Sequence, residues 1–236
     1  SSDVCSSDLN TAKIAGVLPG SVQIETLFAG GSFGRRGNFQ SDYVSECVHV
    51  AKAVGGGRPV KLVWTREDDM TAGYYRPMTF HSVKVALGAD GLPAKWRHRV
   101  VSQDIMKGSP MGGNGIDIAV EGAKGSPYLA ATPVVDGQAN LADVGVPVLW
   151  WRSVGATHAA FVMEHTIDQL AKAAGRDPVD YRRALFTKAN AQRHLAVLNL
   201  AVEKAGPAAA EGYVRGVAVH ESFGSVVAQI AEVKLV

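Results

Sequence analysis

The segment Gly30–Gly37 (GGSFGRRG) holds the residues whose types and spacing point most directly to chemistry. Glycines let a main chain approach a ligand closely, so that consecutive backbone N–H groups can converge on an anion. Arg35 and Arg36 add positive charge to the same loop. The segment follows neither common nucleotide-binding pattern, because it lacks the Rossmann glycine spacing and the P-loop Gly-Lys-Ser/Thr. It predicts an anion-binding loop, and an ordinary turn between a strand and a helix is the alternative.

A second polar group of residues stands in an apolar stretch, Trp150–Gly155 (WWRSVG). Arg152 and Ser153 come just before the most helix-like segment of the chain. Amides at a helix N-terminus attract anions, so this loop is a second candidate for contact with one. The alternative is that the two tryptophans belong to the core and that Arg152 pairs with an acidic side chain.

Other residues with reactive side chains do not form a recognisable metal-binding or nucleophilic motif. His158 and His165 share a helical face next to Glu164, but no HExxH pattern or third ligand accompanies them. The run His220–Ser222 lacks a Gly-x-Ser-x-Gly nucleophile elbow. We therefore predict no metal ligands in this chain and no nucleophile at His220–Ser222.

The first nine residues, Ser1–Leu9 (SSDVCSSDL), resemble the translation of a sequencing adapter more than natural protein. The alternative is a natural polar tail. Without them, the formal charge changes from 24 − 22 = +2 to 24 − 20 = +4, because Asp3 and Asp8 are removed. This charge is too diffuse to indicate nucleic-acid binding. Cys47 is then the single cysteine, so the chain cannot supply the ligands of an iron–sulfur cluster.

Length and composition limit the classes of protein to which the chain can belong. The chain has 236 residues, of which 47% are hydrophobic, and this is typical of one or two globular domains. No apolar run approaches the ~20 residues of a membrane span. The sequence leaves the compartment open between cytoplasm and periplasm.

Periodicity predicts the elements that position these loops. Alternation predicts a strand at Val22–Phe28, apolar content predicts a short strand at Val60–Thr65, and a helix is predicted between them at Asp42–Val54. The turn at Asp90-Gly91 predicts a hairpin of 82–87 with 94–102. Residues 103–146 predict a long loop. The remaining elements are expected to be helices at 159–174, after Asp177-Pro178 and at 190–205, then strands at 215–221 and 228–235.

These motifs together resemble the molybdopterin-binding subunits of the xanthine dehydrogenase/aldehyde oxidase family. The branch of isoquinoline 1-oxidoreductase β subunits and membrane-type aldehyde dehydrogenases is the most similar. Gly30–Gly34 matches its Gly-Gly-x-Phe-Gly loop, and Trp151–Gly155 matches its aromatic-Arg-x-x-Gly loop. A Glu-x-x-x-Asp-x-x-Ala helix, which begins here at Glu164, and a following Asp-Pro segment with arginines also match.

The resemblance implies that both loops hold a molybdenum–molybdopterin cofactor, with a cytosine dinucleotide as one candidate form. Phe33 and Arg152 are expected nearest the molybdenum end, and the two loops are expected to approach each other across one cleft. The full set of cofactor-binding residues implied by the match is Gly30, Gly31, Ser32, Phe33, Gly34, Arg152, Ser153 and Gly155. Arg35, Arg36 and Gly37 stand where some members have a carboxylate, so the substrate is expected to differ from purines.

The implied reaction is hydroxylation of an aldehyde or an N-heteroaromatic compound with oxygen from water. Iron–sulfur clusters would lie on a partner subunit, and a cytochrome c subunit is a further candidate partner. The family's catalytic glutamate is expected beyond Val236, so the chain alone is expected to be inactive. The alternative function is a non-catalytic anion-binding or assembly module.

The expected fold is α+β, with two-layer α/β sandwich units that are incomplete at both ends. We expect a first cofactor-binding unit at 10–150 and a second at 151–236.

Overall fold

The computed structural model describes residues 2–109, 115–207 and 211–235. It combines helices and strands, which confirms the mixed α+β class. Two compact units are discontinuous in sequence. The first unit contains the described residues of Ser1–Pro77, Ile105–Gly113 and Val144–Arg152. The second unit contains those of Met78–Asp104, Asn114–Asp143 and Ser153–Val236.

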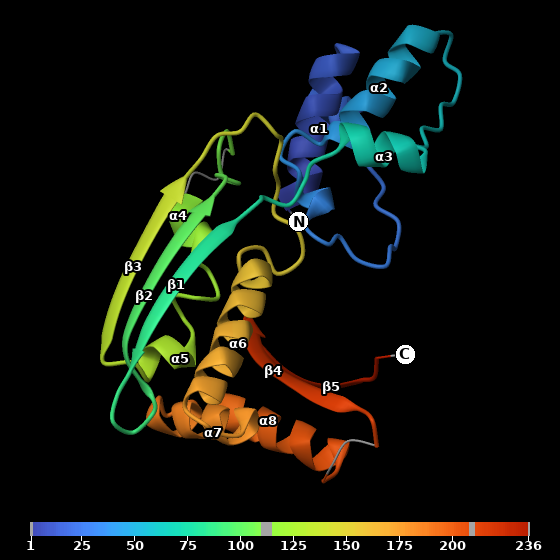
Figure 1. The fold of residues 1–236 in the computed structure, drawn as a ribbon. Coiled ribbons are helices and arrows are strands. Elements are labelled where there is room, and N and C mark those ends of the chain that lie inside the picture. The colour runs from blue at the N-terminus through green and yellow to red at the C-terminus, as the bar shows by residue number, and fades with distance from the viewer. Residues whose placement is uncertain (1, 110–114, 208–210, 236) are drawn as a thin grey trace. The chain divides into compact units, whose positions relative to one another are not determined.

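The first unit is helical. Its elements are α1 (Ser2–Ala15), the 3-10 turns η1 (Pro19–Ser21) and η2 (Arg35–Gly37), α2 (Asp42–Val54) and α3 (Arg66–Ala72) (Figure 1). α1 packs against α2, and the Ser7 hydroxyl donates to Ser41 Oγ at 2.9 Å. The adapter-like residues from Ser2 to Leu9 are therefore helical here, whatever their origin.

Both strands predicted for the first unit are wrong. Residues 22–28 and 60–65 have no strand assignment, and Leu27 and Phe28 are exposed. Alternation gives a segment the right pattern for a strand, but a strand also needs a neighbouring backbone for its hydrogen bonds. Among the described residues of this unit, the one β-bridge joins Tyr75 to Val148. The α2 bounds are as predicted, and Gly55 ends the helix with a positive φ of 66°.

The second unit holds both sheets. β1 (Phe80–Leu87) pairs antiparallel with β2 (Pro93–Ser102), and β2 pairs parallel with β3 (Val134–Leu141). β4 (Val214–Ser222) and β5 (Ser225–Val233) form a separate antiparallel hairpin. The predicted hairpin of 82–87 with 94–102 is confirmed, and the two predicted C-terminal strands are present, although β5 begins at Ser225 rather than at residue 228. The long-loop prediction for 103–146 is wrong for β3 and for the helices α4 (Gly115–Ala119) and α5 (Pro127–Ala130), while 110–114 lie outside the described residues.

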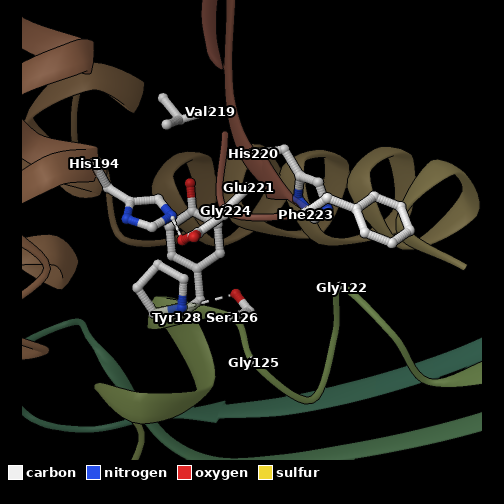
Figure 2. A pocket seen from close by; sticks show the side chains of 11 residues that line it. Gly122, Gly125, Ser126, Tyr128, His194, Val219, His220, Glu221, Phe223 and Gly224 are labelled. Carbon is white, nitrogen blue, oxygen red and sulfur yellow. Dashed lines mark hydrogen bonds and ion pairs between the residues drawn. The ribbon is translucent and has the colours of Figure 1, made fainter. Parts of the chain in front are cut away.

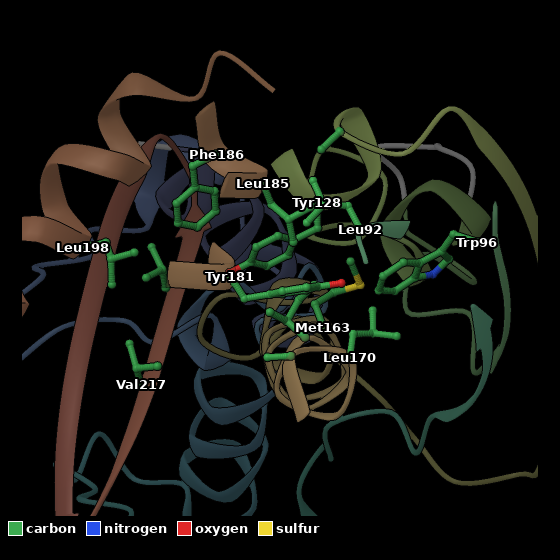
Figure 3. Packing of buried hydrophobic residues seen from close by; sticks show 14 of the residues in the cluster. Leu92, Trp96, Tyr128, Met163, Leu170, Tyr181, Leu185, Phe186, Leu198 and Val217 are labelled. Carbon is green, nitrogen blue, oxygen red and sulfur yellow. The ribbon is translucent and has the colours of Figure 1, made fainter. Parts of the chain in front are cut away.

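Three longer helices complete the second unit: α6 (Ala156–Ala173), α7 (Pro178–Lys188) and α8 (Gln192–Ala205). The helix predicted after Asp177-Pro178 is confirmed as α7, and Asp177 caps it, because the Asp177 carboxylate accepts from the amides of Val179 and Asp180. α6 packs against β1 and β4, and α8 packs against the β4–β5 hairpin. The core lies between these elements, around Trp96, Met163, Tyr181, Phe186 and Leu198 (Figure 3).

Candidate functional site: the Gly30–Gly37 and Trp150–Gly155 loops

The glycine-rich loop takes a backbone path that few residues favour. Gly31 and Gly34 have φ values of 127° and 84°, and Phe33 between them has a φ of 54°. Positive φ is uncommon for a bulky side chain and costs conformational energy, and such strain is concentrated at binding sites and active sites. Phe33 is 45% exposed, so its ring is not held by burial.

The second loop contacts the first through main chain and side chain. The Arg152 amide donates to the Phe33 carbonyl oxygen at 3.1 Å, and the Arg152 guanidinium carbon lies 4.3 Å from the Phe33 ring centroid. A Cβ atom at Gly34 would collide with the Trp150 carbonyl oxygen. The loops can meet at this point because Gly34 has no side chain. The predicted approach of the two loops is confirmed for Phe33, Gly34 and Arg152.

Positive charge is concentrated beside this contact. Arg76 donates to the carbonyl oxygens of Trp151 and Arg152 at 3.1 and 3.2 Å. Burial, and then the charge of Arg152, lower the pKa of Arg76. Arg35 differs, because its guanidinium makes a two-point contact with Asp42 at 2.8 and 2.7 Å. Arg35 is therefore held by Asp42, whereas Arg76 and Arg152 place their positive charge beside the contact between the two loops.

Main-chain donors of the same loop are available to a ligand. The amides of Gly31, Ser32, Phe33 and Gly34 donate to no acceptor among the described residues. Consecutive N–H groups of this kind, next to arginine, suit phosphate and other anionic groups. The donor set and charge thus fit an anionic cofactor such as a molybdenum–pterin phosphate.

Two of the expected site residues belong to the second unit. Ser153 and the following Val154 have positive φ values of 57° and 43°. The Gly155 amide donates to the Glu121 carboxylate at 3.2 Å, and a Cβ at Gly155 would collide with the Ile118 carbonyl oxygen. Close packing against the α4 segment therefore accounts for glycine at position 155.

The histidines of α6 do not converge. His165 stacks on Phe161, whereas His158 Nδ1 lies 2.9 Å from His81 Nε2. His81 Nδ1 in turn lies 2.8 Å from His98 Nε2. The described residues hold no cluster of three side chains arranged for a metal ion. The sequence contains no local signal for this three-histidine chain, because only strand pairing and helix packing bring its members together.

Arg76 and Glu121 were also missed. Both act on the second loop through hydrogen bonds to its main chain, and nothing in their local sequence distinguishes them from other charged residues.

No helix in the described part of the chain has the length and apolarity to cross a membrane.

Comparisons with known proteins identify the class. The family described as the molybdopterin cofactor-binding domain matches residues 5–186, and the chain belongs to this family. The resemblance inferred from the two loops is therefore confirmed at the family level.

Three named relatives are similar to about three quarters of this chain. The chain is 28% identical over 176 residues to isoquinoline 1-oxidoreductase subunit beta of Brevundimonas diminuta. It is 29% identical over 184 residues to the membrane-bound aldehyde dehydrogenase [pyrroloquinoline-quinone] of Gluconacetobacter polyoxogenes. It is 27% identical over 180 residues to a probable xanthine dehydrogenase subunit of Bacillus subtilis (strain 168). These matches cover 73–75% of this chain but only 22–23% of each relative.

Solved structures share the fold. Quinoline 2-oxidoreductase from Pseudomonas putida 86 superimposes with a TM-score of 0.61 and 19% identity, over 90% of this chain and 30% of that one. The aldehyde oxidoreductase from Desulfovibrio gigas gives a TM-score of 0.53 and 18% identity, over 90% of this chain and 25% of that one.

Proposed function

We propose that this chain provides part of the cofactor-binding site of a molybdenum hydroxylase. The contact between Phe33 and Arg152 is the observation that carries the proposal. It brings a strained glycine-rich loop, four amides and an arginine to one place, and a second arginine bonds to the same main chain. The relatives named as oxidoreductases and the family match support the same assignment.

Each residue of the loop contact has a definite task in this proposal. When bound, the molybdenum–pterin group supplies two-electron redox chemistry, in which the substrate receives oxygen from water. The Arg152 guanidinium and the amides of residues 31–34 bind and neutralise the anionic cofactor. Gly34 lets the two loops meet, and the Phe33 ring supports the Arg152 guanidinium from one face. Arg76 fixes the main chain of the second loop.

The substrate class and partners extend the same proposal. The names of the relatives favour an aldehyde or an N-heteroaromatic compound as substrate. A cytosine dinucleotide is a candidate form of the cofactor. The single cysteine left outside the adapter-like segment favours iron–sulfur clusters on a partner subunit, with a cytochrome c subunit as a further candidate partner.

Arg152→Ala in the complete, partner-assembled enzyme tests the proposal. A hydrogen bond to a charged group contributes about 1.5–3 kcal/mol, so we expect molybdenum content or turnover to fall roughly 10- to 150-fold. Arg66→Ala is the control, because Arg66 is an exposed arginine of the same unit and pairs with Asp69 on the surface. Metal analysis and a dye-linked turnover assay give the two readouts.

Unchanged molybdenum content and turnover in Arg152→Ala would show that Arg152 does not bind the cofactor. The alternative function, a non-catalytic anion-binding or assembly module, predicts a different pattern. In that case the variant would lose its partner subunits while the metal content of the remaining complex stayed normal.

A further inference from the structure

A small cavity lies within the second unit, apart in sequence from both cofactor loops. Its volume is about 290 Å³, just below the range of about 300–1,000 Å³ that is typical of small-molecule sites. The segment before α5, the start of α8 and the β4–β5 turn enclose it (Figure 2). Its polar side chains include His194, His220 and Glu221, and Tyr128 and Phe223 contribute aromatic rings.

Two imidazole nitrogens at this cavity lack hydrogen-bond partners. Nε2 of His194 and Nε2 of His220 are buried and bond to nothing among the described residues. His194 is only 7% exposed, and its ring packs on Phe186 with centroids 5.4 Å apart. Buried polar atoms in native proteins are nearly always hydrogen-bonded, to protein, water or a ligand. These two nitrogens can therefore form hydrogen bonds to a group bound in the cavity.

The backbone leaves room at this position. Gly122 has a φ of 78°, and a Cβ there would lie 3.0 Å from His220 Nε2 and 2.8 Å from Ala156 Cα. Any side chain at residue 122 would press on the imidazole and on the first turn of α6. Glycine thus keeps His220 at the cavity.

The charges of the side chains that line the cavity determine whether it favours a cation or an anion. Burial lowers the pKa of both His194 and His220, so both rings are neutral at neutral pH. The acidic group of the lining is Glu221, whose Oε2 lies 3.4 Å from His194 Nε2 without forming a hydrogen bond. Arg193, which is largely exposed, is 3.5 Å from the other carboxylate oxygen. An anion would meet the Glu221 carboxylate, whereas a cation would be attracted to it.

We propose that this cavity binds a small planar cation with several N–H donors, of the amidinium or guanidinium class. Its N–H groups would donate to the Glu221 carboxylate and to the free imidazole nitrogens. Its flat face would pack on the aromatic lining, a contact that favours cations. The proposal does not rest on the cofactor contacts proposed for Phe33 and Arg152.

Three probes of nearly equal shape test the charge selection on the full chain at pH 7.5. Benzamidine is a planar amidinium cation, benzamide is neutral and benzoate is an anion. Titration calorimetry should show benzamidine binding most tightly and benzoate most weakly. On benzamidine binding, NMR titration should report a further decrease in the pKa of His194, because the added positive charge disfavours the imidazolium.

Two variants change the charge in opposite directions. Glu221→Gln should weaken benzamidine binding roughly 10- to 150-fold, as expected for loss of a charged hydrogen bond. Arg193→Gln should strengthen it roughly 2- to 5-fold, because an exposed competing pair is removed. Glu232→Gln is the matched control on the same hairpin, where Glu232 pairs with Arg215, and it should leave the affinity unchanged.

The proposal is overturned if benzamidine does not bind, or binds no better than benzamide. Equal or tighter binding of benzoate would also overturn it, since an anion would then occupy the cavity. A Glu221→Gln variant that retains wild-type affinity, with its fold confirmed by circular dichroism, would show that the cation binds elsewhere.

Discussion

Different contacts stabilise each of the two units internally. In the second unit, buried side chains form one cluster around α6 and α7. In the first unit, Leu27 and Phe28 are 79% and 110% exposed, and the two loops meet through a hydrogen bond and a glycine contact. Gly30–Gly37 and Trp150–Arg152 therefore lie in the unit with the less extensive apolar core, while Ser153 and Gly155 belong to the second unit. Their geometry depends on main-chain contacts and charge rather than on burial.

A buried charge shows how firmly the second unit fixes its side chains. Arg182 is fully buried and makes four hydrogen bonds, to Glu164, to Asp168 and to two carbonyl oxygens. Burial favours loss of its charge, but Glu164, Tyr128 and Asp168 hold the Arg182 pKa above its ordinary value. The other oxygen of Glu164 accepts from the Tyr128 hydroxyl at 2.7 Å. This network joins α5, α6 and α7, and the β4 amide of Val219 also bonds to Glu164.

Removing one side of this network should have the largest effect. Arg182→Ala leaves the Glu164 carboxylate buried without its cation, so we expect a loss of about 3–5 kcal/mol in the free energy of unfolding. Arg183→Ala is the control on the same helix, because its pair with Asp180 is solvent-exposed and is expected to contribute about 1 kcal/mol or less. Native-state hydrogen exchange in α6 and α7 measures both. Equal losses would mean that the buried network does not stabilise the second unit.

Acid should weaken the second unit through the histidine chain. Burial, and then the charge of His81, lower the pKa of His98 to about 4 from its ordinary 6.5. Between these values the unfolded chain binds more protons than the folded one, so stability is complete above pH 6.5 and falls as the pH decreases toward 4. We expect His98 to account for about 2–3 kcal/mol of this loss.

Urea unfolding as a function of pH checks this prediction. His98→Gln removes the titrating group while keeping a polar side chain, so its stability should change less than that of wild type between pH 6.5 and 4. An identical pH dependence in the two proteins would show that His98 is not the group responsible.

The helices and hairpins were predictable because their signals are local. The Asp177-Pro178 start and the Asp90-Gly91 turn each depend on a few adjacent residues. The failed strands at 22–28 and 60–65 depend on a neighbouring backbone that alternation does not specify. β3 was missed for the same reason, since its parallel partner β2 comes much earlier in the chain.

The site was predictable only in part. The glycine loop and Arg152 were found from their residue types, and the family resemblance predicted their contact although they lie far apart in the sequence. Arg76, Glu121 and the histidine chain act through tertiary contacts, for which the sequence contains no local signal. The cofactor roles of Phe33 and Arg152 remain predictions.

The smallest loss of stability is expected for a substitution in the first unit. It tests how an exposed and a buried leucine of that unit differ. Leu27→Ala should change the free energy of unfolding by less than about 0.5 kcal/mol, because its side chain is 79% exposed. Leu149→Ala is the matched change in the same unit, and Leu149 is 1% exposed, so it should cost about 2–5 kcal/mol. Thermal unfolding of the two variants compares the same substitution in two environments. A large loss for Leu27→Ala would mean that residues 22–28 are buried in solution, and that the first unit has a larger apolar core than its described contacts provide.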